Sequence, residues 1–380
     1  MEKLNKRFFT LAILSCLLCS CAPSNIHYET EDYKTVLNWK EGFTICQLND
    51  LHLSTSSNLN QEFEYFRKVI FSNVGTTPDL IVLNGDSFMD ANREIVDKAI
   101  AFFDSLNIKY AFTYGNHDLQ GFYSSDYINQ ALLSAKNSIY KNPSNRGQDD
   151  VYGRSNYFVD LRDKDTDVLK WQLFFFDSNT YYNTSYDVIH DDQVEWYKRC
   201  LLEENGYDVD SLSTSTITDS TFAKSLAFFH IPTFDFQNAI DDFKAASPNS
   251  KTYLDDYCDV RESVSLGDNP TQKGNIVEVM QQYKSTVGIG VGHDHINNTD
   301  IHYQGVSNWP IRLIYGMKTG RGIYHDEDII GGCFYTLHEN KTQNNVNGEL
   351  RDIYFDLQMI HVSYSSDPSS PVWTSPRGDL

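Results

Sequence analysis

The sequence predicts an α/β protein built on a wound sheet, and two observations support this fold class. Short continuous apolar runs, which are typical of buried strands, alternate with segments of helical periodicity in the first part of the chain. Each of the first three apolar runs ends in a polar group that contains aspartate, asparagine or histidine. Because α/β proteins bind their ligands at the carboxyl ends of strands, the same pattern predicts where the functional site lies.

The first strand–helix units lie between Phe43 and Thr113. Strands are expected at residues 43–48, 80–83 and 109–113, and helices at 59–74 and 95–106. Three polar fragments follow these strands, namely Asp50-Leu51-His52, Gly85-Asp86 and Gly115-Asn116-His117-Asp118. We therefore expect these fragments to meet at one edge of a sheet.

The rest of the chain is less regular. Strands are expected at 157–161, 171–176, 225–229, 287–291 and 310–315, and helices at 191–202 and 276–283. Alternating residues at 333–339 and 352–364 indicate antiparallel strands, whereas 205–221 and 248–274 are expected to form loops. No internal repeat and no linker divides this part, so a single domain is expected over 41–364.

The N-terminal residues 1–20 resemble a signal peptide of the lipoprotein type. Lys3, Lys6 and Arg7 precede an apolar run at 8–18 that is too short to span a bilayer. The following Leu-Cys-Ser-Cys resembles the lipobox of bacterial lipoproteins, in which Cys21 would carry the lipid; an ordinary secretory signal is the alternative. We then expect a tether at 21–40, a disordered tail at 365–380, and a protein anchored at the cell envelope or extracellular face.

Composition limits the partners of the chain. Its formal net charge of −21 makes it a poor partner for nucleic acid backbones, so neither nucleic acid binding nor nuclease activity is expected. The cysteines Cys46, Cys200, Cys258 and Cys333 contain no zinc-knuckle pattern and could be free thiols or form up to two disulfides. Cys46 lies in an apolar strand and is expected to be free and buried.

Five polar fragments together predict a two-metal hydrolytic centre. They are the three fragments already named, His230, and the stretch Gly292-His293-Asp294-His295. Carboxylate oxygens and neutral imidazoles are ligands that suit zinc, manganese or iron. A two-metal site needs one carboxylate to bridge ions about 3.5–4 Å apart. Each fragment alone is common, but the ordered set is specific.

This ordered set resembles the signature of the calcineurin-like metallophosphoesterase family, from about Phe43 to Tyr364. The resemblance implies a four-layer α/β/β/α sandwich of two mixed sheets flanked by helices. It also implies one ion held by Asp50, His52 and His295, a second held by Asn116, His230 and His293, and a bridging Asp86. His117 would steady the phosphoryl oxygens or protonate the leaving oxygen, and Asp118 would either orient His117 or cap the next segment.

Gln193 and Trp196 resemble the purple-acid-phosphatase-like branch in particular. Met89, however, occupies the place of that branch's metal-binding tyrosine, which argues against a ferric–tyrosinate centre and favours zinc, manganese or iron without charge transfer. Substrate contacts are expected from Arg312, Lys318 and Arg321, which flank a glycine-rich segment; that segment could instead be a solvated hairpin.

The resemblance implies a phosphoesterase in which a metal-bridging hydroxide attacks a small phosphorylated substrate, with monoesters favoured. The signal-like N-terminal residues add the expectation that it acts outside the cytoplasm. One alternative is a phosphodiesterase acting on cyclic nucleotides, phospholipid headgroups or surface polymers. Another is a surface lipoprotein that binds metal or phosphate without turnover. The complete ligand set together with His117 favours the enzyme.

Overall fold

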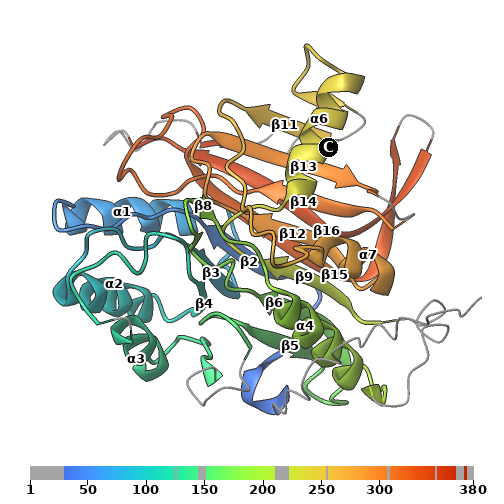
Figure 1. Cartoon of the computed structure of the whole chain (residues 1–380), viewed down its shortest axis with the longest axis horizontal. Coiled ribbons are helices and arrows are strands. Elements are labelled where there is room, and N and C mark those ends of the chain that lie inside the picture. The colour runs from blue at the N-terminus through green and yellow to red at the C-terminus, as the bar shows by residue number, and fades with distance from the viewer. Residues whose placement is uncertain are drawn as a thin grey trace, which may run out of the picture.

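The computed structural model describes residues 30–124, 126–143, 151–209, 222–253, 256–305, 309–346, 349–364 and 372–374. Two large mixed sheets pack against each other (Figure 1). Helices α1 (Leu59–Ile70), α2 (Arg93–Ser105) and α3 (Tyr127–Ser134) cover one sheet, and α4 (Asp191–Glu204), α6 (Phe234–Ala246) and α7 (Ile276–Tyr283) cover the other. The predicted four-layer α/β/β/α arrangement is confirmed.

The six-stranded sheet has the order β17-β16-β15-β2-β3-β4. Its parallel part consists of β2 (Phe43–Leu48), β3 (Leu80–Asn84) and β4 (Lys109–Thr113), in close agreement with the strands predicted there. The antiparallel part consists of β15 (Gly331–Val346), β16 (Glu349–Val362) and β17 (Val372–Thr374). The prediction of a disordered tail at 365–380 is wrong for residues 372–374, which form β17 and pair with β16. Residues 365–371 and 375–380 lie outside the described residues.

The nine-stranded sheet has the order β1-β5-β6-β9-β12-β14-β13-β11-β10. Its strands are β1 (Lys34–Asn38), β5 (Tyr157–Arg162), β6 (Leu169–Phe175), β9 (Lys224–Phe228), β10 (Thr252–Tyr253), β11 (Asp256–Val260), β12 (Thr286–Val291), β13 (Asn297–Tyr303) and β14 (Ile311–Tyr315). A separate hairpin pairs β7 (Tyr181–Tyr182) with β8 (Ser185–Tyr186).

The predicted tether at 21–40 is wrong for its second half. A short 3-10 helix at Thr30–Tyr33 leads into β1, which pairs in parallel with β5. Tyr33 is buried and its ring lies 5.7 Å from that of Trp196, so these residues belong to the folded domain. Residues 1–29, with Cys21, lie outside the described residues, as do 210–221 of the predicted insertion.

The predicted loop at 248–274 is also corrected, since it contains β10 and β11. Strand β11 pairs with β13, a strand that the sequence did not indicate because its buried residues 297–300 are polar. Three of these polar residues have hydrogen-bonded side chains: Thr299 donates its hydroxyl to Leu313 O at 3.2 Å, Asp300 accepts from Arg312, and Asn297 Oδ1 accepts from Arg261 N. Such bonds let polar side chains occupy a buried strand.

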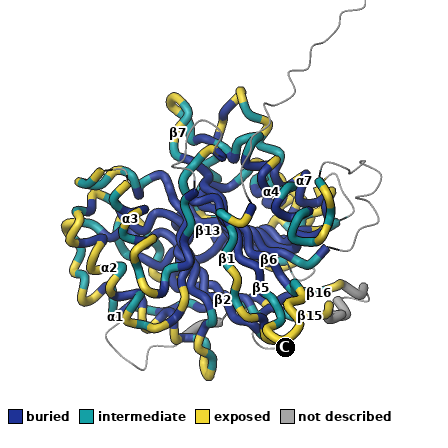
Figure 2. Tube along the Cα trace, turned by 90° about the horizontal axis from the view of Figure 1, so that it is seen from below, coloured by how far each residue is buried: buried dark blue, intermediate teal, exposed yellow. Residues whose placement is uncertain are grey.

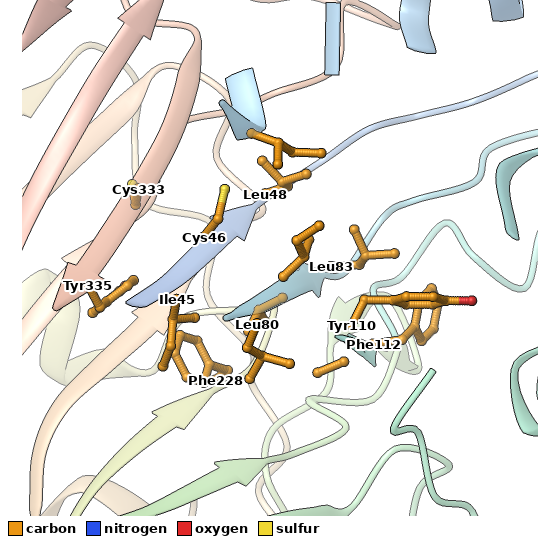
Figure 3. Packing of buried hydrophobic residues seen from close by; sticks show 14 of the residues in the cluster. Ile45, Cys46, Leu48, Leu80, Leu83, Tyr110, Phe112, Phe228, Cys333 and Tyr335 are labelled. Atoms are coloured by element: carbon orange, nitrogen blue, oxygen red, sulfur yellow. The ribbon is translucent and has the colours of Figure 1, made fainter. Parts of the chain in front are cut away.

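The core fills the space between the sheets and the two spaces under the helices (Figure 2). Ile45 of β2 points toward Phe228 of the other sheet, while the neighbouring Cys46 points to the opposite side (Figure 3). Cys46, Cys200, Cys258 and Cys333 are all free and buried, which confirms the expectation for Cys46. Among the described residues, no helix has both the length and the apolar character needed to cross a bilayer.

Candidate metal centre

The polar fragments that end strands β2, β3, β9 and β12 meet at one edge of the molecule, although the strands belong to different sheets. Asn84, the last residue of β3, ties the two sheets together there. Its side-chain amide donates to Phe229 O at 3.1 Å and to Gly290 O at 3.2 Å. The carboxyl ends of strands from both sheets therefore form one continuous site.

Two buried groups of metal-type ligands lie at this edge. Asp50, His52 and His295 form one group, and Asp86, His230 and His293 form the other. Within each group the ligand atoms all lie within 4.8 Å of one another. The structure thus brings together residues that are up to 245 positions apart (50 to 295), in the same grouping that the sequence predicted for the first ion.

The carboxylate of Asp86 lies between the two groups. Its Oδ2 is 3.0 Å from His230 Nε2 in its own group and 3.9 Å from His52 Nε2 in the other. Asp50 Oδ1 similarly lies 3.6 Å from His52 Nε2 and 3.8 Å from His230 Nε2. One oxygen of Asp86 can therefore serve ions in both groups, which is the placement expected of a bridging ligand.

The buried donor atoms that face this centre fit metal ions. In the part of the chain that the structure describes, no hydrogen-bond partner is found for Asp50 Oδ1, His293 Nε2, or either amide atom of Asn116. Buried polar atoms are otherwise nearly always paired, because an unpaired one costs about 1–3 kcal/mol. Cations bound to the two groups would satisfy these atoms. The predicted role of Asn116 as a ligand of the second ion stays a prediction, which its unpartnered buried amide fits.

Main-chain carbonyls set the orientation of two of the histidines. His230 Nδ1 lies 3.0 Å from Asn84 O, and His295 Nδ1 lies 2.9 Å from Tyr324 O. A carbonyl can only accept, so each Nδ1 carries the proton and donates it. The Nε2 atoms of both rings then face the centre, where His295 Nε2 lies 3.0 Å from His52 Nε2 and His230 Nε2 lies 3.0 Å from Asp86 Oδ2. A metal ion bound among these atoms would take the Nε2 lone pairs.

Burial and charge also prepare the ligands. Burial lowers the pKa of His293 to about 3 and that of His52 to about 4, so both rings stay neutral, which is the form that binds metal. Burial acts in the same direction on His230, but the carboxylates of Asp86 and Asp50 outweigh it and raise its pKa to about 10. The two carboxylates thus create a site where positive charge is strongly favoured.

Four of the ligands adopt a left-handed backbone that non-glycine residues rarely use. The φ angles are 53° at Asp50, 46° at His52, 49° at Asp86 and 79° at His293. Each such residue costs of order 1–3 kcal/mol, and such residues cluster at functional sites. The fold holds these turns so that side chains from successive loops point into one centre.

Glycines in the motifs allow the loops to approach closely. A Cβ atom on Gly85, whose φ is +85°, would lie 2.3 Å from His230 Nδ1. A Cβ atom on Gly115 would lie 2.3 Å from Asp86 Oδ1. These distances are far below van der Waals contact, so the Gly-Asp and Gly-Asn-His fragments need glycine for reasons of space.

His117 lies beside the centre without belonging to either ligand group, as the sequence predicted. Its backbone N–H donates to Asp86 Oδ1 at 2.7 Å, and its ring lies 5.4 Å from that of His52. Its Nδ1 lies 2.7 Å from Gln120 Oε1, which orients the ring. Gln120 was not among the residues predicted from the sequence. The available signal was its position three residues after His117 in a turn, which is closed by Gln120 N donating to His117 O.

Neither role predicted for Asp118 matches its contacts. Among the described residues its carboxylate does not meet the His117 ring but is fully buried under the loops. Its Oδ2 accepts from Asp86 N at 2.9 Å and Gly115 N at 2.7 Å, and its Oδ1 accepts from Phe88 N at 2.8 Å. Asp118 therefore positions the loops that carry Asp86 and Asn116 and does not touch the reacting atoms.

The prediction for Arg312 is wrong. It lies near the start of β14, far from the carboxyl end that faces the centre, where it donates to both oxygens of Asp300 and to Phe355 O. Its buried guanidinium is therefore used inside the fold. The strand pattern could not reveal this, because the partner Asp300 belongs to the unpredicted strand β13.

Lys318 and Arg321 lie closer to the centre. Lys318 is buried and donates to Asp50 O at 2.8 Å, so the glycine-rich segment braces the Asp50 loop and is not a solvated hairpin. The amine is used inside the fold, which does not support the predicted substrate contact of Lys318. Arg321 donates to Glu62 Oε1 at 3.1 Å and lines, with His52, a pocket of about 460 Å³. A substrate contact from Arg321 stays a prediction.

Two tyrosines that the sequence did not indicate contact the ligand histidines. The ring of Tyr186 stands edge-on to His293 at 4.4 Å, and the ring of Tyr324 stacks on His295 at 4.3 Å. Tyrosine is frequent in this chain and neither residue lies in a recognisable motif, so no sequence signal distinguished them.

Comparison with known proteins identifies the family. The family model for calcineurin-like phosphoesterases matches residues 43–257, more than half of the 380-residue chain. The chain belongs to the calcineurin-like phosphoesterase family. Members of this family are phosphoesterases that typically bind two metal ions. The match ends before the 292–295 stretch, yet the fold brings His293 and His295 to the ligands of the matched part.

Several individual proteins are similar to this calcineurin-like phosphoesterase. Phosphatase DCR2 of Saccharomyces cerevisiae is 25% identical over 352 residues, which cover 84% of this chain and 56% of the relative. An uncharacterized protein of Schizosaccharomyces pombe is 23% identical over 296 residues, covering 71% of this chain and 47% of the relative. The chain thus spans about half the length of the curated relatives it matches.

Among solved structures, GAP50, the anchor in the inner membrane complex of Plasmodium, aligns with 83% of this chain and 88% of its own. The sequence identity is 15% and the TM-score 0.41, a likeness too low to support a conclusion.

Proposed function

We propose that the chain is a two-metal phosphoesterase that hydrolyses small phosphate esters, with monoesters favoured. The observation that carries this proposal is the pair of buried ligand groups with an oxygen of Asp86 between them. Family membership and the similarity to a phosphatase support it. Gln193 and Trp196 favour the purple-acid-phosphatase-like branch, with Met89 in place of the metal-binding tyrosine.

Seven residues of the chain would hold the two cations. Asp50, His52 and His295 would hold one cation, and Asn116, His230 and His293 the other, with Asp86 between them. Zinc, manganese and iron all suit this donor set. When bound, two such cations supply a nucleophile from water near neutral pH and offset the charge of the phosphoryl group.

His117 would act on the substrate itself. Its Nδ1 is occupied by Gln120, which leaves Nε2 as the atom that meets the substrate. From there the imidazole would donate to a phosphoryl oxygen or give a proton to the leaving oxygen. Replacement of His117 by alanine should abolish turnover while two metals per chain remain bound.

The decisive experiment measures metal content and hydrolysis on one preparation of the full chain. Zinc, manganese and iron are added back separately, and turnover is compared on p-nitrophenyl phosphate and bis-p-nitrophenyl phosphate. Two metals per chain with faster monoester hydrolysis support the proposal. Faster diester hydrolysis would make the chain a phosphodiesterase, two metals without turnover would favour a binding protein, and absence of metal would refute the two-metal centre.

We also propose that the enzyme acts outside the cytoplasm, anchored to a membrane through a lipid on Cys21. The charged, apolar and lipobox-like order of residues 1–21 supports this placement. Replacement of Cys21 by serine should release the protein from the membrane fraction. Unchanged membrane association of this variant would contradict the lipid anchor.

A further inference from the structure

Tyr186 is held firmly over the second ligand group. It ends the β7–β8 hairpin, and its carbonyl accepts from Asp268 N at 2.8 Å. The next residue, Asp187, packs tightly against Gly267. A Cβ atom on Gly267 would lie 2.0 Å from Asp187 O. Asn269 also donates to Asp187 Oδ1 at 2.7 Å. These contacts fix the backbone that carries the Tyr186 ring.

The Tyr186 side chain meets the centre with an unused hydroxyl. Its ring stands perpendicular to the His293 ring, with the centroids 4.4 Å apart. Among the described residues, no hydrogen bond to its hydroxyl is found, and the side chain is neither fully buried nor exposed. Burial raises the pKa of Tyr186, with smaller contributions from Tyr181, Asp86 and Asp294, so the hydroxyl keeps its proton. A phenol that has no protein partner can donate to a ligand.

The first ligand group is contacted by His117, whose ring lies 5.4 Å from that of His52. Tyr186 and His117 therefore contact histidines from different ligand groups. A phosphoryl group that spans both groups would have an imidazole near the first group and a phenol near the second. Donors fixed in advance around such a group stabilise charge on its oxygens at little cost in reorganisation.

We propose that Tyr186 is a further catalytic residue, whose hydroxyl donates a hydrogen bond to a phosphoryl oxygen of the bound substrate on the His293 side. The proposal rests on the proposed phosphoesterase function. The phenol stays protonated throughout and forms no covalent bond. It would contribute to binding of both the substrate and the product phosphate, and more to the transition state as charge on the phosphoryl oxygens shifts.

The test compares the full-length wild type with Tyr186→Phe, which keeps the ring against His293 and removes only the hydroxyl. Both proteins are loaded with manganese, and binding of inorganic phosphate is measured by calorimetry alongside hydrolysis of p-nitrophenyl phosphate. We expect phosphate to bind about fivefold more weakly to the variant, the loss of one neutral hydrogen bond. We expect kcat to fall about tenfold or more, with metal content unchanged.

Tyr181→Phe provides a matched control on the same hairpin. Tyr181 stacks on Tyr186 with the ring centroids 5.3 Å apart, but no ring contact with a ligand histidine is found for it in the described structure. This variant should bind phosphate and turn over like the wild type.

Equal phosphate affinity and equal kcat for Tyr186→Phe and wild type would overturn the role of Tyr186 while leaving the phosphoesterase intact. If the wild type binds metal and phosphate without turnover, the proposed function fails, and the calorimetric difference still decides the role of Tyr186. Equal losses in both tyrosine variants would show that the hairpin as a whole, and not the Tyr186 hydroxyl, supports the centre, and this too would overturn the proposal.

Discussion

Replacing Asp118 by asparagine should loosen both loops that it holds at the centre. The carboxylate accepts N–H groups from Asp86 and Gly115 on one oxygen and from Phe88 on the other, at 2.7–2.9 Å. Burial and the neighbouring charge of Asp86 raise the pKa of Asp118. Because both oxygens accept from N–H groups, however, the contacts themselves favour the ionised form.

The magnitude follows from these three bonds. Asparagine has one acceptor oxygen, so its best orientation keeps the bonds from Asp86 and Gly115 and turns its NH₂ group toward Phe88 N. One bond to a charged group, about 1.5–3 kcal/mol, is then lost, and the other two become neutral and weaker. Removing the charge also removes its cost of burial. A net loss of about 2 kcal/mol in the free energy of unfolding results, together with weaker metal binding.

The assay is urea unfolding of the metal-free and metal-loaded proteins, combined with metal analysis. Asp126→Asn is the matched control, because Asp126 is exposed and its side chain makes no capping hydrogen bond to the following helix. The control should unfold like the wild type. The Asp118 variant should show the loss in both metal states and a reduced metal content at limiting metal concentration. Its activity should recover, at least in part, when metal is in excess.

One result would refute this positioning role. If Asp118→Asn unfolds like the wild type and keeps two metals per chain, but has no activity, then Asp118 acts on the substrate. Its buried carboxylate would then have to become accessible during turnover.

Three further predictions follow from single contacts. Gly85→Ala should lower the metal content, because its Cβ would lie 2.3 Å from His230 Nδ1, and metal analysis of the folded variant checks this. Gln120→Leu should reduce kcat several-fold without metal loss, because His117 loses the partner at 2.7 Å that orients its ring. An unchanged kcat of the metal-saturated variant would show that this contact does not orient His117 for catalysis. Burial, with a smaller effect of Lys341, lowers the pKa of Lys224 to about 8, so this amine takes up a proton on unfolding between pH 8 and the ordinary lysine pKa of about 10.4. The free energy of unfolding should therefore rise with pH over that range, and a rise that persists in Lys224→Met would contradict the assignment.

The strands that carry the site could be predicted from sequence because their signals are local. Strand β2 is buried along its whole length and mostly apolar, and Asp50 lies two residues beyond its end. The same holds for β3 and Asp86. A strand buried on both faces gives a continuous apolar run, and its polar end then marks the edge of the sheet.

The errors came from contacts between distant segments. Strand β1 is a half-buried edge strand that gains its partner only when residue 34 meets residue 158, so its sequence resembles a linker. Arg312 looked available because its partner Asp300 lies in a strand of polar residues. Tyr186 and Gln120 were missed for the same reason, because ring and turn contacts carry no periodic signal.

The backbone strain and unpaired buried atoms of the metal centre cost free energy of folding, which contacts in the surrounding structure must offset. Four ligand residues hold a left-handed backbone, at of order 1–3 kcal/mol each, and several of their buried atoms lack protein partners. The same loops are tied by Asp118, by Lys318 on Asp50 O, and by Asn84 across the two sheets. Since the ties involve main-chain atoms, they hold the geometry independently of the ligand side chains. Replacing a ligand such as His293 should therefore reduce metal binding far more than the free energy of unfolding. Replacing Asp118, Lys318 or Asn84 should reduce both.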